Sequence, residues 1–123
     1  MFKNFKPYGI TNGLPNVSIT KNGMNFSKTA VTKLGNPKHI MFMLDDDEKQ
    51  MLAKVCGDTD TYAVKFAKTE KITSVRFNNK DFLQTIEKMM TWNLKTQGYK
   101  ITGEYFHDEN AILFDLNKAK SMK

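Results

Sequence analysis

Residues 17–26 read Val17-Ser18-Ile19-Thr20-Lys21-Asn22-Gly23-Met24-Asn25-Phe26. Apolar and polar residues alternate on both sides of Asn22-Gly23, and this period of two is typical of β-strands. Asn-Gly is a preferred pair for the two positive-φ positions of a type I′ turn. The stretch therefore predicts a tight β-hairpin.

Further antiparallel hairpins are predicted on either side of two polar turns. Residues 40–55 place an acid-rich turn between two apolar runs, and residues 99–116 do the same around His107-Asp108-Glu109-Asn110. Single strands are expected at 62–66 and 72–77, where β-branched and aromatic residues gather.

Two helices are predicted between these strands. Ser27 stands in N-cap position before residues 28–34, and Gly35 is the residue expected after a helix C-terminus. A longer amphipathic helix is predicted at about 79–93. Its apolar face has the i, i+4, i+7, i+8 spacing of Phe82, Ile86, Met89 and Met90.

The predicted fold class is α+β, with antiparallel hairpins, one short helix and one longer amphipathic helix. A chain of 123 residues is long enough for one packed core and too short for two. We expect an N-terminal arm at 1–16, a single α+β domain at 17–117 and a frayed basic tail at 118–123.

The composition predicts a soluble, cytoplasmic protein with no membrane partner. No run of 18 apolar residues occurs, and the N-terminus lacks the features of a secretory signal. A single cysteine, Cys56, fits a reducing compartment, and with only His39 and His107 beside it no ordinary zinc set can form. We expect no metal site, no cofactor and no catalytic residue.

Three features have both a structural and a functional interpretation. The carboxylates of 45–48 are of the type that binds Mg²⁺ or Ca²⁺, but they lack the spaced pattern of a calcium loop and fit a solvated turn. Cys56 has no cationic neighbour in sequence and fits a structural thiol better than a nucleophile. Trp92 is either a core residue or an anchor in a protein interface.

The positive charge is concentrated in the first third of the chain. Residues 1–40 hold six lysines and no acid, whereas residues 41–123 hold 13 basic and 13 acidic side chains, which accounts for the net charge of +6. Such a segment attracts polyanions, of which nucleic acid is the commonest. The alternative is that these lysines only keep the protein soluble.

Residues 18–55 resemble the swapped-hairpin module of AbrB and MazE-type transcription factors and antitoxins. The resemblance rests on the hairpin, on a short helix that ends in Leu34-Gly35, and on the strand pair that turns on acids. It divides the domain into a module at 17–56 and an added β-β-α-β-β unit at 57–117. Ser27 replaces the proline usual in that family, and Met24 replaces an arginine that commonly follows the early glycine.

The resemblance implies an interlaced homodimer that binds DNA. Basic side chains of the first turn, the short helix and the loop after it would contact the DNA, and these are Lys21, Lys28, Lys33 and Lys38. Lysines favour phosphate contacts over the reading of base edges, so the implied binding is weakly sequence-specific. In size and style the whole chain also resembles small proteins of Firmicute phages and prophages.

The sequence therefore leaves two main functional hypotheses. The first is a small, basic, non-enzymatic DNA-binding protein of AbrB-like type. The second is a phage or prophage protein that binds and inhibits a host protein, such as a defence enzyme. The salt dependence of binding distinguishes them, because phosphate-driven binding weakens steeply as salt rises.

Overall fold

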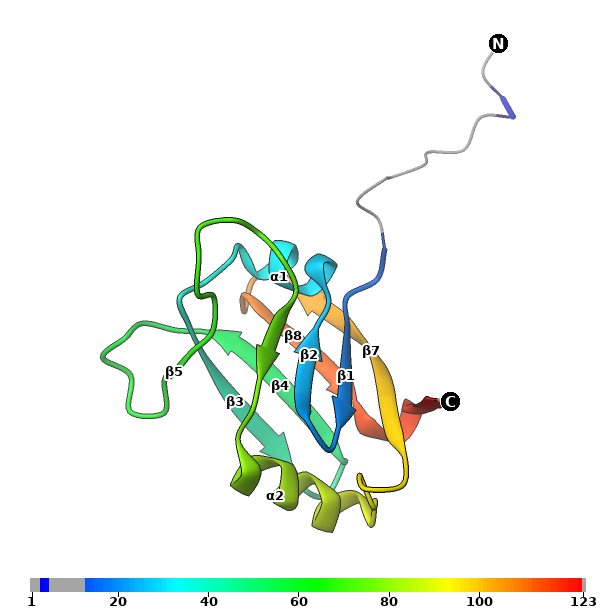
Figure 1. Ribbon diagram of the computed structural model, residues 1–123. Helices are drawn as coiled ribbons and strands as arrows, with labels where there is room; N and C mark the ends of the chain where they lie inside the picture. Colours follow the sequence, from blue (N-terminus) through cyan, green and yellow to red (C-terminus); the bar gives the residue numbers. More distant parts are fainter. Residues whose placement is uncertain (1–2, 5–12, 123) are drawn as a thin grey trace.

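The computed structural model describes residues 3–4 and 13–122 of the chain. In this part of the chain, nine strands form one antiparallel sheet, accompanied by two α-helices and a short 3₁₀-helix (Figure 1). The fold is mixed α and β and mostly sheet, so the predicted α+β class is confirmed at that level. The elements in chain order are β1 (Asn16–Thr20), β2 (Gly23–Phe26), α1 (Lys28–Leu34), β3 (His39–Asp45), β4 (Gln50–Val55), β5 (Val64–Lys65), β6 (Val75–Phe77), α2 (Lys80–Met90), β7 (Gly98–Phe106), β8 (Ala111–Asp115), η1 (Leu116–Lys118) and β9 (Lys120–Met122).

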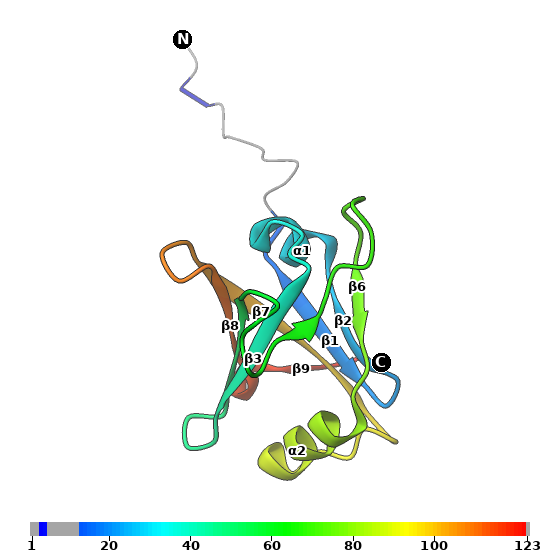
Figure 2. The same ribbon diagram turned by 90° about the vertical axis from the view of Figure 1, so that its left-hand side faces the viewer.

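The sheet curls because its longest strand, β7, belongs to two halves. The strand order is β5-β3-β4-β8-β7-β1-β2-β6. Residues 103–106 of β7 pair with β8, while residues 99–102 pair with β1 and residues 98–100 pair with β9. The halves β5-β3-β4-β8 and β1-β2-β6 therefore face each other across the core, with α1 at one end and α2 at the other (Figure 2).

Aromatic side chains from both halves fill this core. Phe26 of β2 is fully buried, and its ring lies 5.2 Å from that of Phe66 and 6.0 Å from that of Phe114. Phe42 of β3 reaches toward the opposite edge, where its ring centroid lies 4.9 Å from that of Phe77 in β6. These contacts close the space between the two sheet edges by side-chain packing rather than by strand pairing.

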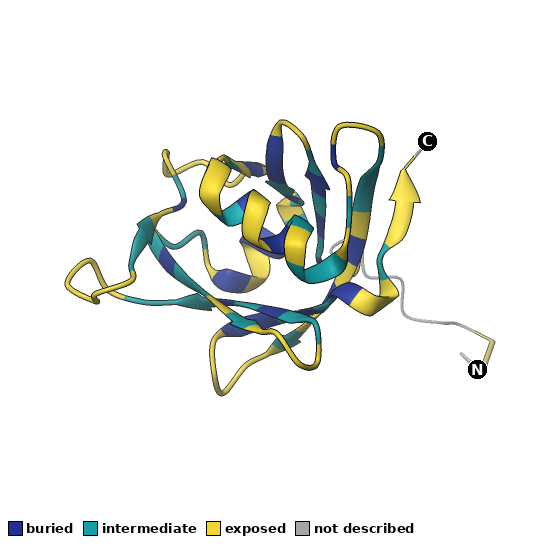
Figure 3. Ribbon diagram, turned by 90° about the horizontal axis from the view of Figure 1, so that it is seen from below, coloured by how far each residue is buried: buried dark blue, intermediate teal, exposed yellow. Residues whose placement is uncertain are grey.

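Helix α2 covers one end of the core, and of its predicted apolar face Ile86 is fully buried while Phe82, Met89 and Met90 are half-buried against the core. Leu83 and Ile86 are buried, and the opposite face of the helix is exposed (Figure 3). The Asn79 side chain caps the helix by accepting a hydrogen bond from the Phe82 N–H at 3.0 Å. The helix ends at Met90, before the predicted residue 93, because Thr91 takes a left-handed conformation with φ 57°.

The first hairpin forms where it is predicted, but its turn is of another type. Thr20 pairs with Gly23, and only Gly23 has a positive φ, at 124°, so the expected type I′ turn with Asn22 at positive φ is wrong. The Thr20 hydroxyl accepts a hydrogen bond from the Asn22 N–H at 3.1 Å, which favours the negative-φ conformation at Asn22. A Cβ on Gly23 would lie 2.8 Å from the Phe77 carbonyl oxygen, so glycine is also required sterically.

The predicted tail, the predicted arm and the two predicted parts of the domain differ from what the structure shows. The predicted frayed tail is wrong for residues 120–122, since they form β9 and pair with β7. Strands of the 17–56 module pair with strands of the 57–117 unit, so the two segments share one sheet. Of the predicted arm 1–16, residues 1–2 and 5–12 lie outside the described residues, and Asn16 already belongs to β1.

Gly103 marks the point where β7 passes from one half of the sheet to the other, and it permits a close approach there. A Cβ at this position would clash with the Ile112 side chain and would lie 2.7 Å from a ring carbon of Phe114. We expect Gly103→Ala to lower the free energy of unfolding by about 1–3 kcal/mol, because the buried partners cannot move away without strain.

Urea denaturation of Gly103→Ala measures this effect. Gly57→Ala is the control, since Gly57 is exposed and a Cβ there meets only a side-chain oxygen of Asp60 at 3.7 Å. Equal stabilities of the two variants would contradict the packing described for β7 and β8.

Candidate nucleic-acid interface

The structure divides the four lysines that the sequence proposes for DNA binding. Lys28 and Lys33 lie on α1 and Lys38 follows it, and all three are exposed. Lys21 is also exposed, but it lies in the turn of the β1–β2 hairpin, whereas α1 begins beyond the other end of that hairpin. About 10 Å of strand separates the two ends at about 3.3 Å per residue, so Lys21 belongs to a different part of the surface.

Helix α1 is fixed in place by its two caps and its buried face. The Ser27 hydroxyl accepts hydrogen bonds from the Ala30 N–H at 3.2 Å and from the Asn16 N–H at 3.1 Å. Ala30, Val31 and Leu34 are buried, and Gly35 ends the helix with φ 84°. The chain leaves the helix through Asn36, which also has a positive φ of 52°, and so directs Lys38 toward β5.

Strand β5 brings a second group of lysines beside Lys38. The Lys38 carbonyl accepts a hydrogen bond from the Phe66 N–H at 2.8 Å, and the Pro37 carbonyl accepts one from the Ala67 N–H at 3.0 Å. His39 pairs directly with Lys65 in the β3–β5 register. Phe66 is buried in the core, whereas Lys65 before it is exposed and Ala67 after it is half-buried.

The residues after α1, the start of β3 and the segment from β5 onward line an open groove with a volume of about 790 Å³, which we call the basic groove. Three lysines and one acid line it, together with a histidine, an amide and small or aliphatic residues. The lining comprises Gly35, Asn36, Lys38, His39, Lys65, Ala67, Lys68, Thr69, Glu70 and Ile72. Among the described residues, none of the three lysines has a carboxylate within ion-pair distance.

The loop after β5 extends the positive surface beyond the basic groove. The Asn36 side-chain amide donates hydrogen bonds to the carbonyls of Thr69 and Glu70 at 3.1 and 3.2 Å, which ties this loop to the end of α1. A smaller hollow of about 300 Å³ lies beside it and is lined in part by Lys71 and Arg76. The two hollows share Asn36, Ala67, Lys68 and Thr69 and so form one continuous surface.

Most of these basic residues were missed by the sequence analysis. Residues 41–123 are neutral in total, and this sum conceals the segment 61–80, which holds five basic side chains and only one acid, Glu70. A shorter window along the chain would have detected the signal. It would not have shown that Lys65 and Lys68 lie beside Lys38.

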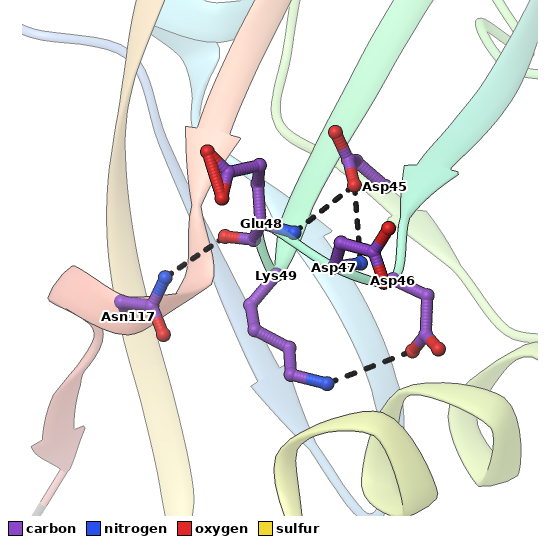
Figure 4. Close-up of polar contacts among 6 residues, drawn as sticks. All are labelled: Asp45, Asp46, Asp47, Glu48, Lys49 and Asn117. Atoms are coloured by element: carbon purple, nitrogen blue, oxygen red, sulfur yellow. Dashed lines mark hydrogen bonds and ion pairs between the residues drawn. The ribbon is translucent and has the colours of Figure 1, made fainter.

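The largest group of acids lies at the other end of β3. The Asp45 carboxylate accepts hydrogen bonds from the N–H groups of Asp47 and Glu48 at 3.1 and 3.0 Å, and Asp46 lies 3.7 Å from the Lys49 ammonium (Figure 4). The Asn117 amide donates to the Glu48 carbonyl at 2.9 Å. The turn is therefore held by its own polar groups and by η1.

The second acidic turn, which contains Asp108 and Glu109, lies at the same end of the sheet as the basic groove. It joins β7 to β8, and β4 lies between β8 and β3, whose first residue, His39, lines the groove. At about 4.8 Å per strand, β8 is roughly 10 Å from β3 and roughly 14 Å from β5. Among the described residues, no ion pair joins the carboxylates of this turn to Lys38, Lys65 or Lys68.

The other candidate residues of the sequence are Cys56, Trp92 and the possible metal ligands. Burial raises the pKa of the half-buried Cys56 thiol, and the negative charge of Asp60 raises it further, so the neutral thiol is favoured. Trp92 is half-buried and stacks on Tyr99 with ring centroids 3.9 Å apart. Within residues 3–4 and 13–122, no three His, Cys, Asp or Glu side chains converge as metal ligands.

Comparison of the chain with protein-family models, with curated protein sequences and with solved structures gives no significant match. In the part of the chain that the structure describes, no helix is both long enough and apolar enough to cross a membrane. The basic groove, by its geometry and charge, is therefore the feature of the molecule that bears on its function.

Proposed function

We propose that this protein is a small, non-enzymatic DNA-binding protein that acts in the cytoplasm and holds DNA at the basic groove. The observation that supports the proposal is the convergence of Lys38, Lys65 and Lys68 from two segments far apart in sequence, with no ion-pair partner for them among the residues that the structure describes. Bringing like charges together is unfavourable unless an anion offsets it. Lys71 and Arg76 line the adjoining hollow and extend the same surface, and Lys33 lies in the last turn of α1, two residues before Gly35 of the groove.

The proposed binding is dominated by phosphates and is weakly sequence-specific. Lysine offers a point charge to a phosphate oxygen, whereas reading a guanine edge favours the two-pronged contact of arginine. Arg76 is the single arginine of the chain. Release of counterions from the DNA backbone then makes the affinity strongly dependent on salt.

The resemblance to the AbrB-type module adds a proposed homodimer. In the described residues, the strands of 17–56 pair with β7, β6, β5 and β8 of the same chain. A homodimer would therefore join two completed sheets. Sedimentation across a concentration series measures its formation, and a chain that stays monomeric at high micromolar concentration would remove this part of the proposal.

The DNA-binding proposal is tested by reversing two charges in the groove. We expect Lys65→Glu combined with Lys68→Glu to weaken binding of a mixed-sequence DNA at least tenfold. The slope of log affinity against log salt should shrink by about two, because each lysine that contacts a phosphate releases about one counterion. An electrophoretic shift titrated with salt measures both quantities.

The matched control reverses two exposed lysines near the C-terminus, Lys118 and Lys120, and so changes the net charge by the same amount. We expect it to reduce affinity less and to leave the salt slope nearly unchanged. Equal losses in both double variants would assign the effect to net charge alone. Absence of DNA binding in the parent protein would favour the hypothesis of a host-protein inhibitor.

A further inference from the structure

The basic groove is concave, and this shape bears on the form of DNA that it receives. Reading double-stranded DNA requires an element that protrudes into a major groove about 12 Å wide. The seven-residue helix α1 instead buries Ala30, Val31 and Leu34, and only its C-cap, Gly35, and the residue after it line the groove. A volume of about 790 Å³ is that of a ligand pocket and can hold only a small part of any nucleic acid.

The chemical character of the residues that line the basic groove also bears on the form of DNA that it receives. The phosphate backbone of a duplex needs only cations on an accessible surface. This groove also contains Ile72, which is 36% exposed beside lysines, and the aliphatic side chain of Ala67. Apolar surface inside a cationic groove serves unpaired bases, which present their faces once they leave the duplex stack.

The register of β3 and β5 places a ring beside a cation in the same groove. His39 and Lys65 are directly opposite each other in antiparallel strands, with Cβ atoms expected about 5 Å apart. An imidazole can stack on a base, and an adjacent ammonium can contact the phosphate of the same nucleotide. The Asn36 amide also lines the groove, although two carbonyls of the loop accept its hydrogen bonds.

We infer that the basic groove binds a short single-stranded segment of DNA in preference to a duplex. Phosphates of a few consecutive nucleotides lie against Lys38, Lys65 and Lys68, and one base packs against His39 and Ile72. This inference rests on the proposed DNA-binding function and names the form of DNA that the groove recognises.

The test compares a fluorescein-labelled 12-nucleotide oligothymidine with a 12-base-pair duplex, by fluorescence anisotropy at one salt concentration. We expect the full-length protein to bind the single strand at least tenfold more tightly. His39→Ala and Ile72→Ala should each weaken single-strand binding about fivefold or more, since losing one base stack has an effect of this order. Duplex affinity should stay unchanged in both variants.

Met43→Ala is the matched control, because Met43 is 50% exposed on β3 and does not line the groove. It should leave single-strand binding unchanged, and circular dichroism should show that all three variants remain folded. Equal or tighter binding of the duplex, or unchanged single-strand affinity in His39→Ala and Ile72→Ala, overturns the inference and leaves the proposed DNA-binding function standing. Absence of binding to either form of DNA overturns both.

Discussion

Replacing Phe26 by alanine is expected to lower the free energy of unfolding by about 3–5 kcal/mol, the range for deleting a large buried aromatic side chain. Phe26 has no exposed surface, and its ring contacts Phe66, Phe114 and Phe42, with centroids 5.2, 6.0 and 5.9 Å away. These partners lie in or beside the opposite half of the sheet. The substitution therefore leaves a cavity where the two halves meet, and the stability of a small domain is only about 5–15 kcal/mol.

Urea denaturation followed by circular dichroism measures this effect, with Phe106→Ala as the control. Phe106 ends β7 and is 39% exposed, so its truncation should cost less than about 1 kcal/mol. Similar losses in the two variants would mean that Phe26 does not occupy the centre of the core.

The second large effect is expected from Ile86→Asp in α2. Ile86 is fully buried, and the described residues contain no buried polar or charged side chain that could pair with a carboxylate there. An unpaired buried charge costs about 3–5 kcal/mol, and the apolar contacts of the isoleucine are lost in addition. We expect the variant to be largely unfolded at room temperature.

Gln84→Asp is the matched control for this substitution, because Gln84 lies on the exposed face of the same helix. Its cost should be limited to the lower helix propensity of aspartate, about 0.5 kcal/mol. Thermal melts of both variants provide the comparison. Equal melting temperatures would show that α2 does not cover the core with its Leu83 and Ile86 face.

The position of α2 also affects the candidate site indirectly. Phe82 of α2 lies 4.9 Å from Phe42 of β3 between ring centroids, and the same strand begins at His39 in the basic groove. An intact helix is therefore part of what holds β3 in place beside β6. The groove residues replaced in the tests of DNA binding, Lys65, Lys68, His39 and Ile72, are exposed or half-buried, and none of them lies on α2.

Local elements of this protein are determined by residues that are neighbours in the chain. Alternation of period two specified the hairpins, and the side chains of Ser27 and Asn79 cap the two helices at the positions that the sequence indicates. The turn at Lys21-Asn22 shows the limit even of local rules. The choice between turn types depended on a hydrogen bond from the Asn22 N–H to the Thr20 hydroxyl and on the nearby Phe77 carbonyl.

Only the tertiary structure decided which strands pair and which lysines meet. Backbone hydrogen bonds can join any two strands and therefore do not select partners. Strand β1 pairs with β7, about eighty residues away, because the packing of side chains such as Phe26 and Phe114 favours that arrangement. In the sequence, Lys38 is 27 positions from Lys65, and Lys21 is nearer to Lys38 than Lys65 is. Pairing of β3 with β5 brings Lys65 nearer to Lys38 than Lys21 is, because residues paired across adjacent strands lie within about 5 Å of each other. Along a strand, in contrast, each residue adds about 3.3 Å, which takes Lys21 away from Lys38.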